Sequence, residues 1–294
     1  MGLTDWARVL VAALVGLGML VIVPLGLDLL PGAWPAGRRW VWFAGAVPGA
    51  VSLWLPRGPL AAGLAVPYLL VALVLAARAW PRLRTAFAAP TKAAGAAAAP
   101  AAAAAVTALV TPSIAAGALV AERVGYRLFG FRLDVLALTE AHFHYAGFAA
   151  ALVAGLVGAY GGGTRGGPAA ALAVPAGTGL VLAGFFVGDW LELAGAAVLT
   201  AGMWIAAAIT LRTVRPGQSD PVVRALLAVA AVVLAATMVL ALDWALGHVV
   251  RVPYLPLSWM VATHGLANAL GFGLCSVLAW RRMGRRPGAR PDGA

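Results

Sequence analysis

The sequence is poor in the residues from which soluble domains, disulfides and metal sites are built. It has a single cysteine, Cys275, and only ten acidic residues among 294. One cysteine excludes an intrachain disulfide and a metal site built on a cysteine pair. Charged residues make up only 11% of the chain, whereas hydrophobic residues make up 63%. This composition excludes an ordinary soluble domain, whose charged fraction is about 25%.

Long apolar runs dominate what remains, and about 20 apolar residues are needed for a helix to cross a bilayer. We therefore predict an all-α, polytopic transmembrane helix bundle, with about nine spans and eight as the lower count. The bundle forms a single transmembrane domain over residues 1–280. The expected helices cover about 7–28, 39–55, 59–79, 101–121, 139–160, 168–188, 190–211, 221–248 and 258–280.

The fourth of these segments, 101–121, carries the weakest helix signal. It is rich in alanine, which is only marginally apolar, and prolines stand at positions 90, 100 and 112. A kinked span, a re-entrant segment, and a linker followed by a short helix all fit this pattern.

The net charge of +11 comes from basic residues in the loops. No RNA- or DNA-binding module accompanies them, so nucleic acid is not an expected partner. With nine spans, 15 of the 21 basic residues lie on the side of the C-terminus and six on the other side. Since positive charge marks the inner side, we expect a multi-pass protein of the cell membrane with its N-terminus outside and its C-terminus in the cytoplasm. Residues 281–294 are expected to form a disordered, basic cytoplasmic tail.

The few polar residues of the expected spans gather near the outer side. The stretch TEAHFHYAGF, residues 139–148, begins the fifth helix and holds an acid and two histidines. Three further segments bring polar groups to the same depth: GDWLEL, ALDWALGH and THGLAN. The residues concerned are Glu140, His142, His144, Asp189, Glu192, Asp243, His248, His264 and Asn268.

Helical spacing places Glu140 and His144 on one face, four residues apart, and His142 roughly opposite. A carboxyl group beside an imidazole is a familiar acid–base pair. Asp243 lies inside its span, where an ionisable group costs about 2.5–3.5 kcal/mol on insertion scales and usually faces the bundle interior. His264 and Asn268 are four residues apart and share one face of their helix.

From this pattern we predict four catalytic residues that meet in a shared cavity, namely Glu140, His144, Asp243 and His264. The residues expected around the substrate are His142, Tyr145, Asn268, Asp189, Glu192 and Trp244. No cofactor or metal is assigned, although His144 and His264 could ligate a metal ion or a haem. The alternative for each polar group is structural: acids near helix ends can reach water, and a histidine can hydrogen-bond between helices.

Two motifs resemble a known family. LTEAHFHYAGF and, more than a hundred residues later, THGLANALGF are similar to segments of YndJ-like membrane proteins of bacteria, and the resemblance covers about residues 105–280. It implies a membrane helix bundle and draws attention to the same residues. The family is described as transporters or left unassigned, so the resemblance adds little chemistry. Residues 1–100 match no motif.

Three functions fit these observations. The first is a membrane enzyme, a cyclase or isomerase, that uses acid–base chemistry on a lipophilic substrate such as a terpenoid or polyketide-like intermediate. Trp190, Trp244 and Trp259 would then shelter a developing cation. The second is a small-molecule or proton-coupled transporter, and the third a structural or accessory membrane protein. The bilayer and a lipophilic small molecule are the expected partners.

Overall fold

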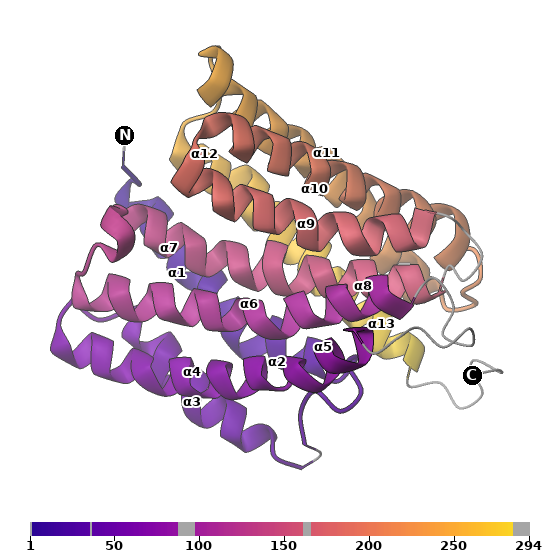
Figure 1. Ribbon diagram of the computed structural model, residues 1–294, viewed down its shortest axis with the longest axis horizontal. Coiled ribbons are helices and arrows are strands. Elements are labelled where there is room, and N and C mark those ends of the chain that lie inside the picture. Colours follow the sequence, from indigo (N-terminus) through magenta and orange to yellow (C-terminus); the bar gives the residue numbers. More distant parts are fainter. Residues whose placement is uncertain (1, 36, 88–97, 161–165, 285–294) are drawn as a thin grey trace.

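The computed structural model describes residues 2–35, 37–87, 98–160 and 166–284, and these ranges contain helices and no strand. Within these ranges the helices form nine passes along the bundle, and consecutive passes run in opposite directions (Figure 1). The first five passes are α1 (Asp5–Leu17) with η1 (Gly18–Ile22) and α2 (Val23–Leu27); α3 (Arg39–Ser52); α4 (Pro59–Ala77); α6 (Ala98–Val124); and α7 (Leu133–His142) with η3 (Phe143–Ala149) and α8 (Ala150–Tyr160). The last four are α9 (Gly166–Val187); α10 (Asp189–Ile209) with η4 (Thr210–Val214); α11 (Pro221–Val250); and α12 (Leu257–Met260) with η5 (Val261–Gly265), η6 (Asn268–Leu274) and α13 (Cys275–Gly284). Two short elements, α5 (Ala79–Phe87) and η2 (Leu128–Gly130), lie between passes.

Eight helices in the described ranges are long and apolar enough to cross a membrane, and the predicted all-α transmembrane fold is confirmed. The remaining pass is α3, which has 14 residues and begins at Arg39. At 1.5 Å per residue it is roughly 21 Å long, shorter than the hydrocarbon core of a bilayer. It still carries the chain from one end of the bundle back to the other.

The alanine-rich segment forms one long helix, because α6 runs without interruption from Ala98 to Val124 with Pro112 inside it. Pro90 lies outside the described residues. Of the expected basic tail, residues 281–284 belong to α13, and the remainder, 285–294, also lies outside them.

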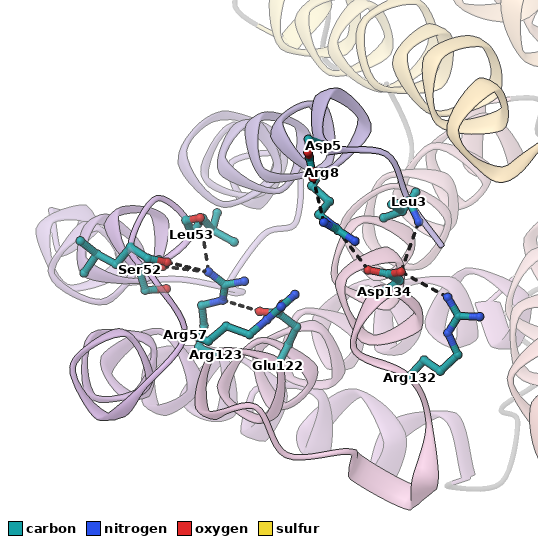
Figure 2. Close-up of polar contacts among 11 residues, drawn as sticks. Leu3, Asp5, Arg8, Ser52, Leu53, Arg57, Glu122, Arg123, Arg132 and Asp134 are labelled. Carbon is teal, nitrogen blue, oxygen red and sulfur yellow. Dashed lines mark hydrogen bonds and ion pairs between the residues drawn. The ribbon is translucent and has the colours of Figure 1, made fainter. Parts of the chain in front are cut away.

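We call the end of the bundle where α1 begins the N-terminal end. Hydrogen bonds join three passes there. The Thr4 backbone N–H donates to the Ser258 hydroxyl oxygen over 3.0 Å, and the Leu3 N–H donates to the Asp134 carboxylate over 3.2 Å. Arg8 and Arg132 also pair with Asp134 (Figure 2). The starts of passes one, five and nine are therefore held side by side.

At the opposite, C-terminal end, ion pairs tie other passes together. Asp28, after α2, pairs with Arg39 of α3 and with Arg281 of α13. Asp220 accepts a hydrogen bond from Arg282 Nε over 2.7 Å, and it also caps α11 by accepting from the Val222 N–H. Since α1 begins at one end and α13 finishes at the other, the two ends of the described chain lie on opposite sides of the bundle (Figure 1).

Helices α9 and α10 pack backbone against backbone through small residues. A Cβ added to Gly195 of α10 would lie 2.4 Å from the backbone nitrogen of Val181, and one added to Gly184 would lie 2.5 Å from that of Glu192. Close approach through glycine is a common way for helices to associate in lipid, where the hydrophobic effect does not drive them together. The two helices therefore form one tightly packed hairpin.

The two halves of the fifth pass have different neighbours. Both halves pack against α6, but its second half, α8, also packs against α9 and α10, whereas its first half, α7, also packs against α1. Figure 1 shows α9 leaning away from α7 towards the N-terminal end. Side chains of α7, α10 and α11 near this end keep partial exposure, among them Glu192 and Asp243, and His142 is exposed.

Candidate functional site

The stretch at residues 139–148 changes from an α-helix to a π-helix at Phe143. Glu140 and His144 are buried, with exposed fractions of 1% and 0%, whereas His142 is exposed. The acid and the second histidine therefore point into the bundle, whereas the side chain of the first histidine stays accessible. π-Helical turns of this kind are frequent at functional sites.

Both ring nitrogens of His144 are hydrogen-bonded. Its Nδ1 lies 2.6 Å from the Glu140 carbonyl oxygen, which can only accept, so Nδ1 carries a proton. In a neutral ring, Nε2 is then the acceptor, and the Tyr68 hydroxyl of α4 donates to it over 2.5 Å. Tyr68 is itself fully buried. This bond links the third and fifth passes inside the bundle.

The neighbouring passes are shaped around these two rings. A Cβ on Gly18 would lie 2.7 Å from the His144 Cβ, and a Cβ on Gly49 would lie 2.8 Å from the Tyr68 Cβ. The buried Trp42 ring meets the Tyr68 ring edge to face at 5.7 Å, and its Nε1 donates to the Met19 carbonyl oxygen over 2.9 Å. The two rings are therefore closely packed by the residues of the first and second passes.

The Glu140 carboxyl group makes no hydrogen bond to this pair, although its charge acts on Tyr68. Its Oε1 is buried and has no hydrogen-bond partner among the described residues. The charge of Glu140 acts on Tyr68 on one side and on Glu122, Arg123 and Arg57 on the other. Glu140 is therefore a buried acid, without a direct counter-ion, between a tyrosine–histidine pair and an ionic cluster.

The ionic cluster closes the N-terminal end between α3, α4 and α6 (Figure 2). Glu122, which is 1% exposed, accepts from Arg57 Nε over 2.7 Å and pairs with Arg123 through its other oxygen. Arg123 Nη1 also donates to three carbonyl oxygens at and just after the end of α3, those of Ser52, Leu53 and Leu55. These bonds satisfy backbone groups that the helix end leaves free.

A second polar group joins the ninth pass to α11. His264 Nδ1 donates to the Thr237 carbonyl oxygen over 2.8 Å, and the Asn268 side-chain amide donates to His264 Nε2 over 3.2 Å. The Thr237 hydroxyl donates to Asn268 Oδ1 over 2.8 Å and so closes the network. His142 lies near enough to act electrostatically on His264. Its Nδ1 donates to the Leu138 carbonyl oxygen, and Nε2 makes no hydrogen bond within the described chain.

A third group lies where α10 begins and α11 ends. Glu192 interacts electrostatically with His248 and with Asp189. The His248 ring packs edge to face against Trp244 and Tyr254, each with a centroid distance of 5.0 Å. This arrangement holds the last turns of α11 to the segment that follows them.

The four residues predicted to be catalytic are not joined by direct contacts. Glu140 and His144 share one buried site, whereas His264 belongs to the network with Thr237 and Asn268. Asp243 is partly exposed and makes no hydrogen bond or ion pair with any described residue. A pocket of about 480 Å³ at the N-terminal end is lined by Gly2, Thr4, Trp6, Pro256, Leu257, Ser258, Trp259 and Ala262, and by none of these four.

Other residues of the predicted binding set have structural or interfacial surroundings. The buried Tyr145 hydroxyl donates to the Leu14 carbonyl oxygen over 2.8 Å and so ties the fifth pass to the first. Trp190 and Trp259 are 73% and 57% exposed near the N-terminal end, as in the aromatic belt of a membrane protein. Among the described residues no group of three or more histidines, cysteines and acids could hold a metal ion.

Sequence reasoning overlooked Tyr68, Glu122 and Thr237. A signal for Tyr68 was present, because it is the one side chain in Pro59–Ala77 that can form a hydrogen bond. Glu122 is followed at once by Arg123, which made it resemble an ordinary helix end. Thr237 carried no comparable signal, since a threonine inside a span usually bonds its own helix.

Comparison with protein families places the chain. A family model described as YndJ-like protein matches residues 13–272. The match confirms the resemblance carried by the two motifs and extends it into the first hundred residues. No curated protein and no solved structure matches the chain.

Proposed function

Starting from a chain that belongs to the YndJ-like family, we propose that it is a proton-coupled transporter of a small molecule, with Glu140 as the residue that takes up and releases the proton. One observation carries this proposal. Glu140 is 1% exposed within a membrane span, and its Oε1 has no hydrogen-bond partner among the described residues.

The energetic argument compares Glu140 with Glu122. Both acids are 1% exposed, but Glu122 is paired with two arginines and Glu140 is not. An ionised group in the middle of a span costs about 2.5–3.5 kcal/mol on insertion scales. Buried polar groups that only stabilise a fold are nearly always hydrogen-bonded. An unpaired buried acid is therefore better explained by a role in which it changes its protonation state.

Protons would reach Glu140 from the N-terminal end of the bundle. Arg57 is 41% exposed at that end and pairs with Glu122, whose charge in turn acts on Glu140. In the proposed orientation in the cell membrane, this end faces the outside and the arginine-rich end faces the cytoplasm. The acid would then exchange protons with the outer solution.

Profiling of small molecules in cells and in their medium by mass spectrometry tests the proposal. Cells that produce the wild-type chain, Glu140→Gln or the control Asp5→Asn, a change at a 98% exposed acid outside the predicted site, are compared with cells that lack the protein. We expect the wild type and the control to shift unchanged compounds between cell and medium, and Glu140→Gln to lose this effect. Equal distributions for the wild type and Glu140→Gln, at equal protein levels, would overturn the role of Glu140.

An enzyme is the second candidate, because His142 is exposed and its Nε2 makes no hydrogen bond within the described chain. In this case a lipophilic substrate would enter from the bilayer and meet His142 beside His264, with Asp243 as the acid. The same profiles decide between the candidates, since an enzyme produces a new cyclised or isomerised compound. Asp243→Asn should then lower its formation about 10²–10⁴-fold, the usual contribution of acid–base catalysis.

A further inference from the structure

The pocket at the N-terminal end has no part in the proposed proton exchange. It has a volume of about 480 Å³ and is lined by residues from the start of the first pass and the start of the ninth. We propose that it binds a neutral, largely apolar small molecule with one hydrogen-bond acceptor, such as a ketone or ester oxygen, and that compounds of this class are transported. The choice of transported compound rests on the proposed function, whereas the binding site itself does not.

The size and the walls of the pocket fit a small molecule. Ligand pockets in proteins usually have volumes of about 300–1,000 Å³ and mostly apolar or aromatic walls with a few polar groups. Trp6 of α1 and Trp259 of α12 both line this pocket, and their rings meet edge to face at a centroid distance of 5.9 Å. Such a contact stabilises both rings in place. Because the two rings are 45% and 57% exposed, they form an aromatic wall that a ligand can reach.

Two hydroxyl groups supply the polar part of the pocket. Ser258, which is 6% exposed, accepts hydrogen bonds from the Thr4 backbone N–H over 3.0 Å and from the Thr4 hydroxyl over 3.1 Å. The two hydroxyls carry two protons, and the bond between them uses only one. Within the described ranges no other group accepts a hydrogen bond from either hydroxyl. One hydroxyl proton is therefore left for an acceptor atom of a ligand.

The lack of charge in the pocket walls indicates a neutral ligand. The lining residues, all from the described chain, are uncharged. Asp5 stands between two of them in the sequence, but its 98% exposed side chain pairs with Arg8 over 2.9 Å and does not line the pocket. A charged molecule would lose hydration on entry without gaining a counter-ion. A neutral molecule with one acceptor loses little, because the remaining hydroxyl proton replaces its bond to water.

The pocket lies at the mouth of the bundle and not at the buried acid. Trp6 is in the first turn of α1, and Gly18, which packs against His144, follows it by twelve residues. At 1.5 Å per residue the His144 site is roughly 18 Å further along the first pass. Exposed tryptophans are also typical of the membrane interface. The pocket is therefore suited to take up a compound from the interface before any step that involves Glu140.

Photolabelling with three benzophenones tests the site. Benzophenone is a neutral aromatic ketone that bonds covalently to nearby C–H groups under ultraviolet light. The probe 4-benzoylbenzoate carries the same group with a negative charge, and (4-benzoylbenzyl)trimethylammonium carries it with a positive charge. The full chain in lipid nanodiscs is irradiated with each probe over a range of concentrations, and labelled residues are mapped by mass spectrometry. We expect benzophenone to label residues 2–6 and 256–262 saturably, and more strongly than either charged probe.

Two variants separate the hydrogen bond from the space. Ser258→Ala removes one hydroxyl and should lower labelling of the pocket by benzophenone below saturation about 2–10-fold, the usual contribution of one hydrogen bond. Ala262→Phe fills the pocket but keeps both hydroxyls, and it should abolish this labelling. The matched controls are Ser113→Ala, whose hydroxyl bonds within its own helix, and Ala201→Phe, at an exposed alanine of α10. Both controls should be labelled like the wild type.

Four results would each overturn the inference. They are label spread over the lipid-facing helices without saturation, unchanged pocket labelling in Ala262→Phe, unchanged pocket labelling in Ser258→Ala, and stronger pocket labelling by a charged probe. Glu140→Gln should bind benzophenone like the wild type. Failure of the transport proposal would show elsewhere, as equal small-molecule profiles for the wild type and Glu140→Gln while the pocket is still labelled.

Discussion

The Tyr68 hydroxyl donates a hydrogen bond to His144 Nε2 over 2.5 Å, between two side chains that are both 0% exposed. The bond connects α4 to the π-helical segment η3, whose His144 ring also bonds to the backbone carbonyl oxygen of Glu140. Two glycines and a tryptophan on the first two passes are fitted around it. The first three passes and the fifth therefore share one polar core, and its energetics can be tested.

Tyr68→Phe should destabilise the protein. The change removes the hydroxyl and leaves His144 Nε2 buried without a partner, which costs about 1–3 kcal/mol. Thermal unfolding in a mild detergent measures the effect. Tyr126→Phe is the control, since Tyr126 is 62% exposed. Equal melting temperatures for the two variants would contradict the importance of the bond.

Gly18→Ala should be destabilising by about 1–3 kcal/mol, because the added methyl group would lie 2.7 Å from the His144 ring and force it to move. Gly16→Ala in the same helix is a matched control, with nothing within 4 Å of its Cβ. We expect the control to be neutral or slightly stabilising, since alanine favours a helix over glycine. The unfolding transitions of both variants are compared in the same detergent, and a Gly18→Ala variant as stable as the control would refute the close packing around the His144 ring.

Gly195→Ala should separate α9 from α10, because its Cβ would lie 2.4 Å from a backbone nitrogen that no rotamer change can move. Gly179→Ala, in the same hairpin, meets nothing within 4 Å. In size-exclusion chromatography the first variant should give a smaller peak of folded protein than the wild type, and the second should give the same peak as the wild type. Tolerance of both changes would mean that the helices are less closely packed than described.

The orientation of the protein in the membrane can be tested by cysteine labelling in a Cys275→Ser background. Asp5 has a 98% exposed side chain at the N-terminal end, and Arg78 is exposed at the C-terminal end. We expect a membrane-impermeant maleimide to label Asp5→Cys in intact cells, and Arg78→Cys only after the membrane is opened. The reverse pattern would invert the proposed topology.

The fold was readable from the sequence because each span is an apolar run bounded by prolines, glycines or arginines. Hydrophobicity reports whether a segment can cross a bilayer, so the helical class and the approximate spans followed directly. The short second pass was harder to judge. Its apolar run continues past Ser52, but helix α3 stops there and the chain turns before Pro59.

The site was readable only in part. The spacing of Glu140 and His144 indicated a shared face, and both side chains do lie in one buried site. Their partner Tyr68 could not be assigned, because no motif in the first hundred residues showed which passes pack together. A shared depth along the helices was also not enough to predict which side chains contact one another. His264 and Asp243 lie near the same end of the bundle, yet rotation about each helix axis gives them other surroundings.

The shortness of α3 has a consequence for the surrounding lipid. Its 14 residues are several ångströms too short to cross the hydrocarbon core, so non-helical chain completes this crossing. The backbone groups of that chain need water or lipid headgroups as hydrogen-bond partners. The bilayer beside α3 should therefore be locally thinned, which costs fractions of a kcal/mol per ångström of mismatch. Because Trp42 and Gly49 of α3 contact Tyr68, a thicker membrane would strain the same helix that supports the buried pair. Membrane thickness thus becomes a physical variable to which this protein is expected to respond.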